Sequence, residues 1–496
     1  MEAEGGNQEA HPPTPLIGAR TIPDKGGFPY AWLAVLPLLG WWAYGLFDLD
    51  EGYYAAVAAE MNRRGEWITP YYNGHPWFEK PILLYWVAKP CLAIFGDMIG
   101  PRLPSVLATL AMYAVVGWFA RRHFGAAQAS RAVLVLGGSL LVVGIARMML
   151  TDPLLDLAMT VAFTTYWESI VSDWRWRWVT AAALGIGILA KGPVCILLFI
   201  PVAAITAYAL PQFRSRMARG WFVGTLILLF VVASWYVPAY LKNGQLFVKQ
   251  FLIEQNFQRF TGGDSAHTFG GIVGLVFYVV ILAVGMAPWS FKIPDAWKFA
   301  PKDPLSFYLK TWALVVFGFF TISSAKLPHY ILPACPALAL LIADELDRTR
   351  FPMSRMAAWT VIVCVIANAA FFTYYRQSGQ GDIHAIARYL KEHAKPDDSV
   401  AEYGIGKPTK DQGTLKPHLQ QTSEPSVLLY LDRSVIDTEH WSDVLAAPGR
   451  TWLITLADDD TPFRHPVPGK TTVPVKGDWS ESRYKLDLLV PHGERQ

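Results

Sequence analysis

Long apolar runs dominate this chain and restrict the folds open to it. A helix needs roughly 20 mainly apolar residues to cross a bilayer. Runs approaching that length lie near 29–47, 104–120, 131–150, 153–170, 178–190, 193–210, 220–241, 269–290, 305–322, 330–345 and 355–375. Charged residues make up only 17% of the chain, against about 25% in soluble proteins. The sequence therefore predicts a polytopic α-helical membrane protein with about 11 transmembrane helices.

The loops between these runs differ in charge. The run Ile82–Phe95 is short and is interrupted by Lys89 and Pro90, so we expect it to lie in the membrane interface. With the N-terminus inside, every cytoplasmic loop is then basic, as the positive-inside rule requires. These loops are Arg121–Arg122, Arg175–Arg177, Arg214–Arg219, Lys292–Lys302 and Arg348–Arg355. The pattern predicts a bacterial cytoplasmic-membrane protein that gathers its unusual polar segments on the outer, periplasmic face.

Composition divides the chain into three parts. Residues 1–28 are polar and rich in Pro and Gly, and we expect a disordered cytoplasmic tail. Residues 29–375 form the predicted membrane domain, with an outer loop at 48–103. Residues 376–496 are soluble in character and predict a small periplasmic α/β domain. The expected elements there are a helix at Ile383–His393 and strands at Ser426–Tyr430 and Thr451–Leu456.

A dense set of ionisable residues, at 48–81, directly follows the first apolar run. Such groups are costly at a membrane unless they are used or paired. Asp50 and Glu51 open a helical stretch, where acids in the first turn suit the helix dipole. The dipole accounts for one acid well and three poorly, which favours a functional role for Asp50. Glu79 and Lys80 lie at the end of the loop. They form either a surface ion pair or a binding site, in which the carboxylate holds a metal or the acceptor and the ammonium holds a phosphate.

Three short outer turns also carry charged residues. Arg147 and Asp152 flank the first turn, Lys191 lies in the second, and the third begins at Lys326. A lone Lys or Arg near a helix end usually extends to the interface, but three such turns facing the acidic loop favour an anion site. His267, in another outer loop, is either a polar loop residue or a ligand.

An ordered set of motifs resembles the GT-C membrane glycosyltransferases, in particular the bacterial aminoarabinose transferases of lipid A and the wider protein mannosyltransferase-like group. The resemblance covers roughly residues 30–345. The matching segments begin with Asp-x-Asp-Glu-x-x-Tyr-Ala at 48–55, Gly-Glu-Trp-Ile-Thr-Pro at 65–70, Asn-Gly at 73–74, Phe-Glu-Lys-Pro at 78–81 and Tyr-Trp at 85–86. They continue with Arg-Leu-Pro-Ser at 102–105, Thr-Asp-Pro at 151–153, Ala-Lys-Gly-Pro at 190–193, Pro-Trp-Ser at 288–290 and Lys-Leu-Pro-His-Tyr-Ile-Leu-Pro at 326–333.

The resemblance implies transfer of a sugar from polyprenyl phosphate at the outer membrane face. It implies that Asp50 is the base, with Glu51 as the second catalytic candidate. It further implies that Glu79 and His267 can hold a divalent metal such as Zn, Mg or Mn. The aminoarabinose enzymes usually continue with further membrane segments, whereas this chain becomes soluble in character after about residue 375. The identity of the acceptor therefore stays open: it is lipid A, another glycolipid, a glycan or a protein.

The residue types suit this chemistry on independent grounds. A departing polyprenyl phosphate needs charge stabilisation, which Lys, Arg or a metal supplies, and an acceptor hydroxyl needs a nearby base. The phosphate-binding candidates are Lys80, Arg102, Arg147, Lys191, Arg259 and Lys326. The candidates for lining the acceptor site are Tyr54, Asp152, His329 and Tyr330. The chain shows no nucleotide-binding loop, which favours a lipid-linked donor, and no basic block typical of nucleic-acid binding.

Two other functions compete with the transferase. A transporter or flippase of lipid-linked sugars should show paired repeats and broken helices near the membrane midplane, whereas here the ionisable residues lie toward one face. An accessory scaffold would leave the acidic loop unexplained. The glycosyltransferase is the preferred interpretation.

Overall fold

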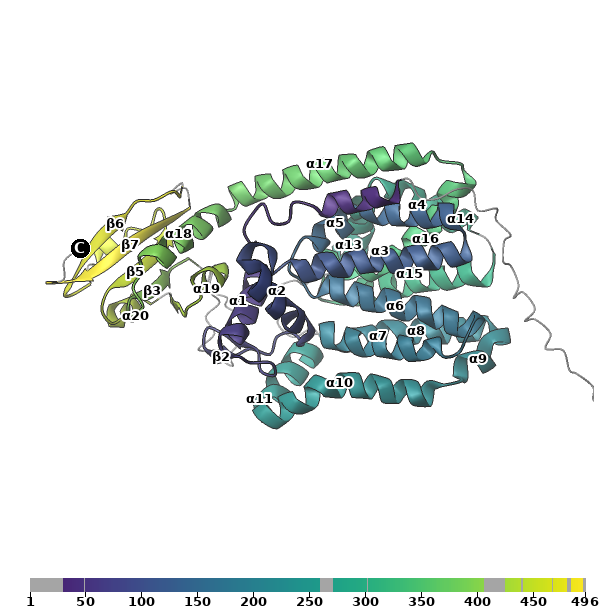
Figure 1. Ribbon diagram of the computed structural model, residues 1–496, viewed down its shortest axis with the longest axis horizontal. Helices are drawn as coiled ribbons and strands as arrows, with labels where there is room; N and C mark the ends of the chain where they lie inside the picture. Colours follow the sequence, from purple (N-terminus) through teal and green to yellow (C-terminus); the bar gives the residue numbers. More distant parts are fainter. Residues whose placement is uncertain are drawn as a thin grey trace, which may run out of the picture.

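The structure, a computed structural model, describes residues 30–258, 271–405 and 424–493, apart from residues 49, 301, 439, 466 and 480–482. The predicted tail at 1–28, Arg259 and His267 therefore lie outside the described residues. Figure 1 shows an elongated helical bundle with a smaller sheet-containing part at one end. The long helix α17 (Met353–Gln377) runs along one side of the bundle toward that part.

The bundle contains five segments that are long and apolar enough to cross a membrane. They are α3 (Leu103–His123), α10 (Trp221–Asn243), α15 (Pro304–Ile322), the segment Pro328–Arg348 and α17. Three bent helix pairs raise the number to as many as eight. These findings, for the described residues, confirm a polytopic helical membrane protein, whereas the count of about 11 stays a prediction. The other bundle helices include α4 (Ala126–Gly137), α5 (Leu140–Ala146), α6 (Asp152–Val171), α7 (Trp176–Lys191), α8 (Val194–Ala209), α9 (Arg214–Ala218), α13 (Gly271–Gly285), α14 (Ile293–Phe299) and α16 (Cys335–Arg348).

Two of the apolar runs differ from the predicted single spans. The run at 29–47 forms only a short 3-10 helix, η1 (Ala31–Leu38). Pro37 lacks a backbone donor and Gly40 adopts a φ of 88°, so a continuous helix is disfavoured there. The run at 131–150 is divided between α4 and α5, which meet at a bend of 67°.

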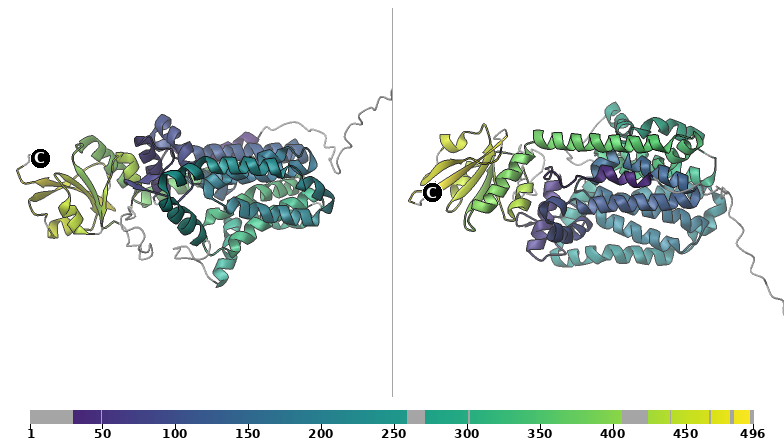
Figure 2. Two further views of the ribbon diagram at one scale, coloured as in Figure 1. Left: turned by 90° about the horizontal axis from the view of Figure 1, so that it is seen from below. Right: turned by 45° about the horizontal axis from the view of Figure 1, so that its top comes forward.

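The outer loop forms a compact cap at one end of the bundle. It contains α1 (Asp50–Arg63), a hairpin of β1 (Tyr71–Tyr72) and β2 (His75–Pro76), and α2 (Leu83–Ile99). Helix α2 is not among the spanning segments, and its Gly96 has a non-helical φ of 72°. The two views in Figure 2 also place this cap between the bundle and the C-terminal part.

The C-terminal part is a five-stranded mixed sheet with helices, in the strand order β4-β3-β5-β7-β6. Its elements are α18 (Gln380–His393), β3 (Ser399–Tyr403), α19 (Ser426–Leu431), β4 (Ile436–Thr438), α20 (Trp441–Ala446), β5 (Thr451–Leu456), α21 (Thr461–Arg464), β6 (Lys470–Val475) and β7 (Tyr484–Pro491). The predicted strand at Thr451–Leu456 is confirmed as β5. The strand predicted at Ser426–Tyr430 is wrong, because this segment is helix α19. All of its side chains are buried, and a short buried apolar run has no periodicity to separate helix from strand.

Candidate active site

The first turn of α1 is anchored by a buried ion pair. Glu51 is fully buried, and its Oε2 lies 2.7 Å from an Nη of Arg102 at the start of α3. The same carboxylate accepts hydrogen bonds from the backbone N–H groups of Phe47, at 2.9 Å, and Met149, at 2.6 Å. The pair therefore ties α1 to α3 and to the turn before α6.

Arg102 has no N–H left for a ligand. Two of its five N–H groups bond Glu51, and a guanidinium group has five such donors. The other three bond the carbonyl oxygens of Trp41, Tyr44 and Gly45 at 2.8, 2.9 and 2.8 Å. This saturation argues against the predicted phosphate contact of Arg102, and the bonds of Glu51 fix the position of the helix turn that contains Asp50.

Asp50 lies on a different face of α1 from its neighbour Glu51. Consecutive residues on a helix are about 100° apart, and while Glu51 points into the core, Asp50 is exposed. Its carboxylate interacts electrostatically with Tyr54, one turn along α1, and with His329 in the turn η5 (Pro328–Ala334). The predicted base therefore lies on an accessible surface, next to a turn that is far away in sequence.

Residues of the second and third predicted turns meet at Asp152, the first residue of α6. Its Oδ1 lies 2.5 Å from Nζ of Lys191, and its Oδ2 lies 3.7 Å from Nε2 of His329. The Lys191 ammonium also sits 4.2 Å from the ring centre of Tyr330. Lys80, from the outer loop, acts electrostatically on both Asp152 and His329. The structure thus brings together residues from four separate segments.

Tyr54 and Glu79 lie at the edge of this cluster. The Tyr54 side chain is buried, and burial, reinforced by the carboxylates of Asp50 and Glu79, raises its pKa well above the usual value. A phenol in that state stays neutral and is able to donate a hydrogen bond. Glu79 also acts electrostatically on the buried tyrosines Tyr53 and Tyr85.

Two of the predicted phosphate ligands are engaged elsewhere in the protein. Arg147 is buried and bonds Oδ1 of Asn368 at 2.9 Å. The ammonium of Lys326 donates to three carbonyls at the end of α15, of Phe320, Thr321 and Ser323, at 3.1, 2.7 and 2.9 Å. Such a lysine caps the C-terminus of a helix. In this geometry Lys80 and Lys191 are the better placed cations.

The C-terminal part supports the site in a way that the sequence did not indicate. Helix α19 packs against α1. The carboxylate of Asp48 accepts hydrogen bonds from the N–H and hydroxyl of Ser426, at 3.0 and 2.5 Å. Two residues earlier, the N–H of Leu46 donates to the hydroxyl of Tyr430 at 2.8 Å. These contacts hold the segment just before Asp50, and they join residues almost 400 positions apart, where no local pattern exists to reveal them.

The pKa of Asp48 is raised well above its usual range. Burial is the main cause, and the neighbouring carboxyl of Glu424 adds to it. Glu424 itself bonds the side-chain amide of Gln380 at 2.7 Å and the hydroxyl of Tyr484. Polar contacts therefore join the segment just before α1 to the C-terminal part.

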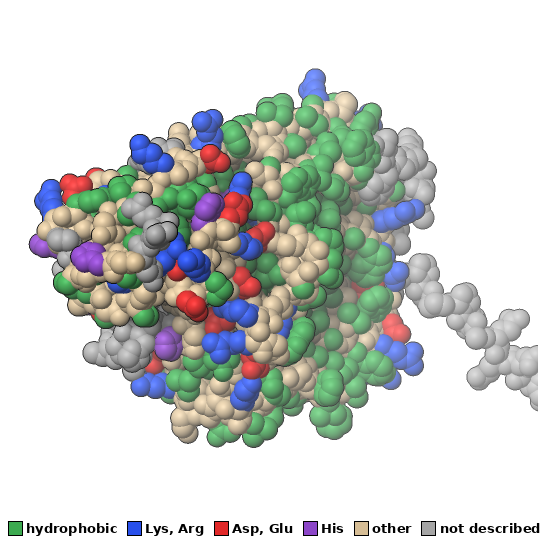
Figure 3. Space-filling model, turned by 60° about the vertical axis from the view of Figure 1, so that its left-hand side comes forward, with side chains coloured by type: hydrophobic (Ala, Val, Ile, Leu, Met, Phe, Trp, Pro, Cys, Tyr) green, Lys and Arg blue, Asp and Glu red, His purple; other side chains and the backbone are tan. Residues whose placement is uncertain are grey.

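Figure 3 shows charged side chains of both signs gathered where the bundle meets the C-terminal part, beside a flank that is mostly hydrophobic. Within the described part of the chain, no three His, Cys, Asp or Glu side chains are arranged to hold a metal ion. Because His267 falls outside that part, the predicted metal pair of Glu79 and His267 stays a prediction.

The same architecture occurs in ArnT from Cupriavidus metallidurans. Its apo structure superposes with a TM-score of 0.73 at 19% identity, covering 92% of this chain and 95% of that chain. The structure bound to undecaprenyl phosphate gives a TM-score of 0.71 at 21% identity. This chain has the GT-C fold of ArnT. The archaeal oligosaccharyltransferase AglB from Archaeoglobus fulgidus is a more distant neighbour, with a TM-score of 0.50 at 10% identity, over 86% of this chain and 69% of AglB.

Sequence comparisons agree with this GT-C fold. Residues 79–237 match the family model for dolichyl-phosphate-mannose-protein mannosyltransferases. A curated relative, the undecaprenyl phosphate-alpha-4-amino-4-deoxy-L-arabinose arabinosyl transferase of Edwardsiella ictaluri, is 31% identical over 314 residues. That alignment covers 61% of this chain, which spans only 56% of the relative's length. The predicted resemblance to GT-C and aminoarabinose transferases is confirmed.

Proposed function

We propose that this protein is a membrane glycosyltransferase that moves a sugar from polyprenyl phosphate to a hydroxyl of a glycolipid, glycan or protein acceptor. One observation carries the proposal: the exposed carboxylate of Asp50 and the ammonium groups of Lys80 and Lys191 all act electrostatically on the same residue, His329. Transfer from a lipid phosphate needs a base and a site for the anionic leaving group, and this cluster supplies both. The names of the relatives support undecaprenyl phosphate as the lipid and an amino-arabinose as the first sugar to test.

The proposed reaction is a single displacement. Asp50 takes the proton of the acceptor as the acceptor atom forms a bond to the anomeric carbon of the sugar. The bond from that carbon to the phosphate oxygen breaks, and polyprenyl phosphate leaves with the electron pair. Lys80 and Lys191 stabilise the charge that develops on the phosphate. Asp152 holds the Lys191 ammonium in place and, since the ammonium has three donors, leaves others for the phosphate.

We place the site and the C-terminal part on the periplasmic side of the bacterial cytoplasmic membrane. The support is the charge of the loops, because the basic cytoplasmic loops predicted from sequence fall at the opposite ends of the same helices. Arg102 and the pair Arg121–Arg122, for example, lie at the two ends of α3. The acceptor proposed first is a lipid A-type glycolipid, with other glycans and proteins as further candidates.

The test is mass spectrometry of membrane glycolipids and envelope glycoproteins. The cells compared carry the wild type, no protein, Asp50→Asn, or the matched control Asp97→Asn on α2. A mass increment of one sugar should depend on the protein and on Asp50, and the control should keep it. Normal product from Asp50→Asn would exclude Asp50 as the base and favour the transport alternative. Binding of undecaprenyl phosphate by the purified Asp50→Asn protein establishes that this variant is folded.

A further inference from the structure

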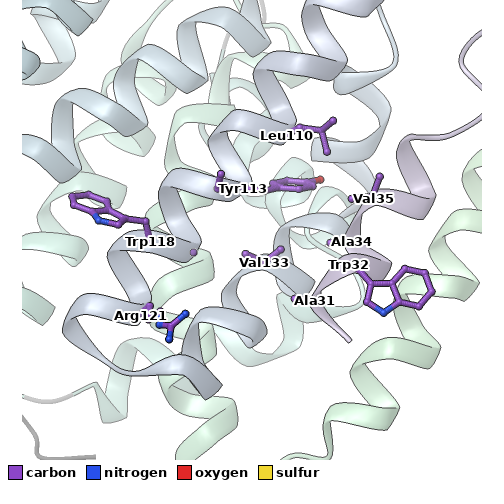
Figure 4. A pocket seen from close by; sticks show the side chains of 11 residues that line it. Ala31, Trp32, Ala34, Val35, Leu110, Tyr113, Trp118, Arg121 and Val133 are labelled. Atoms are coloured by element: carbon purple, nitrogen blue, oxygen red, sulfur yellow. The ribbon is translucent and has the colours of Figure 1, made fainter. Parts of the chain in front are cut away.

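A groove on the flank of the bundle lies apart from the site. It runs between η1, α3 and α4 and has a volume of about 510 Å³. Figure 4 shows Leu110 at one end, Arg121 at the other and the ring of Tyr113 between them, with Trp118 and Trp32 on opposite sides. The lining is apolar except for Arg121 and the edges of the aromatic residues.

The position of the groove along α3 separates it from the site already described. Helix α3 begins at Leu103, beside the Arg102 anchor, and ends at His123. Its 21 residues span about 30 Å at 1.5 Å per residue, so Arg121 lies near the face opposite Asp50. The groove therefore belongs to the other leaflet, where a donor reacting at Asp50 does not place its phosphate.

The dimensions of the groove fit one acyl chain. Leu110 and Arg121 are 11 residues apart on α3, which corresponds to about 17 Å. That length is about half the thickness of a bilayer hydrocarbon core, and hence about one leaflet. Trp32 and Trp118 are partly exposed, and aromatic residues of this kind favour the level of the lipid head groups.

The positive charge of Arg121 indicates an anionic lipid head group. Arg121 is exposed and has no hydrogen-bond or ion-pair partner among the residues that the structure covers. Its neighbours on α3 do have an acidic partner, since Glu168 contacts both Arg122, at 3.0 Å, and His123, at 2.6 Å. One uncompensated guanidinium therefore stands at the mouth of an apolar groove, and basic residues at this depth bind anionic lipid head groups.

We propose that this groove is a binding site for an anionic glycerophospholipid of the leaflet opposite the catalytic site. One acyl chain lies along α3 against Tyr113 and Val133, and the lipid phosphate contacts Arg121. Because η1 and α4 form the other walls, the bound lipid fills the space beside the short first helix and stabilises its packing. This proposal does not depend on the transferase activity.

Native mass spectrometry of the full-length protein tests the proposal directly. The detergent-purified protein is titrated with phosphatidylglycerol or with zwitterionic phosphatidylethanolamine. We expect tighter retention of phosphatidylglycerol, and a loss of about fivefold in its affinity in Arg121→Gln, the factor for one basic residue near an anionic surface. Ala114→Trp, which fills the groove, should remove the bound lipid, whereas Arg219→Gln, a matched arginine at the same end of the bundle, should change nothing.

Any of the following results would overturn the proposal. They are equal retention of the two lipids by the wild type, unchanged phosphatidylglycerol affinity in Arg121→Gln, or displacement of the bound lipid by polyprenyl phosphate at equal concentration. Thermal unfolding of Ala114→Trp without lipid, compared with the wild type, separates a blocked groove from a misfolded protein. A folded Ala114→Trp protein that still retains the lipid would equally refute the site.

Discussion

The substitution Glu51→Gln probes how the first turn of α1 is held in place. The carboxylate of Glu51 accepts four hydrogen bonds, two on each oxygen: Oε1 from Arg102 and the N–H of Met149, Oε2 from Arg102 and the N–H of Phe47. Glutamine has the same shape, but one oxygen becomes an NH2 group. Whichever oxygen is replaced, one arginine donor and one backbone donor then face another donor.

The expected cost follows from burial, since neither side chain of the pair is exposed. Removing one charge of a fully buried pair destabilises a protein by about 3–5 kcal/mol, because the other charge is left uncompensated. The orphaned backbone N–H accounts for about 1–3 kcal/mol of that cost. We therefore expect Glu51→Gln to lower the free energy of unfolding by at least about 3 kcal/mol, measured by denaturant titration of the protein in detergent micelles.

Glu60→Gln on the same helix is the matched control. Glu60 is also buried, but its ionic partner Arg64 is 41% exposed, and a pair with an exposed partner contributes only about 1 kcal/mol or less. Oε1 of Glu60 accepts hydrogen bonds from both Arg64 and the N–H of Gly74, so the remaining oxygen of glutamine is able to keep both bonds. A loss below about 1 kcal/mol in Glu51→Gln, or equal losses in the two variants, would refute the idea that Glu51 anchors the site. Transfer activity should fall with Glu51→Gln even at temperatures where the variant is folded, because Asp50 is its direct neighbour.

Three further predictions concern the surroundings of the site. Ser426→Ala removes the hydroxyl bond to Asp48 and should lower the free energy of unfolding by about 1 kcal/mol. In a transfer assay it should lower kcat more than it raises KM. An unchanged kcat would show that the C-terminal part does not position the site. Lys191→Met should weaken undecaprenyl phosphate binding about tenfold, as loss of one charge-assisted contact implies, and equal affinity in a binding titration would remove Lys191 from the phosphate site. Partial burial opposes ionisation of Glu66, but its bonds to Lys242 and to two backbone N–H groups prevail and lower its pKa from 4.5 to about 2. Because the folded-state pKa is the lower one, the stabilisation is complete above about pH 4.5 and is lost as the pH falls toward 2; thermal unfolding between pH 5 and 2 should show this loss in the wild type but not in Glu66→Gln.

The sequence by itself determined the class of the fold and most members of the residue cluster around Asp152. The length of the apolar runs is a direct consequence of bilayer thickness, and the basic loops report which helix ends share a face. Once the outer turns share that face, Asp152, Lys191 and His329 are candidates for one site together with Asp50 and Lys80. The structure does bring these residues together, through the contacts of Asp152 and the electrostatic interactions of His329.

Only the tertiary structure decided which charged residues are free to act. Asp50 and Glu51 are adjacent in the same motif, yet one is exposed and the other is enclosed by Arg102. The residue type alone does not predict whether an arginine has an N–H available for a ligand. For Arg102, that depends on carbonyl groups from a loop some 60 positions away. The support from Ser426 is likewise a contact across the fold. Periodicity and charge pattern describe the immediate neighbours of a residue in the chain, whereas hydrogen-bond saturation is set by the neighbours that folding brings into contact.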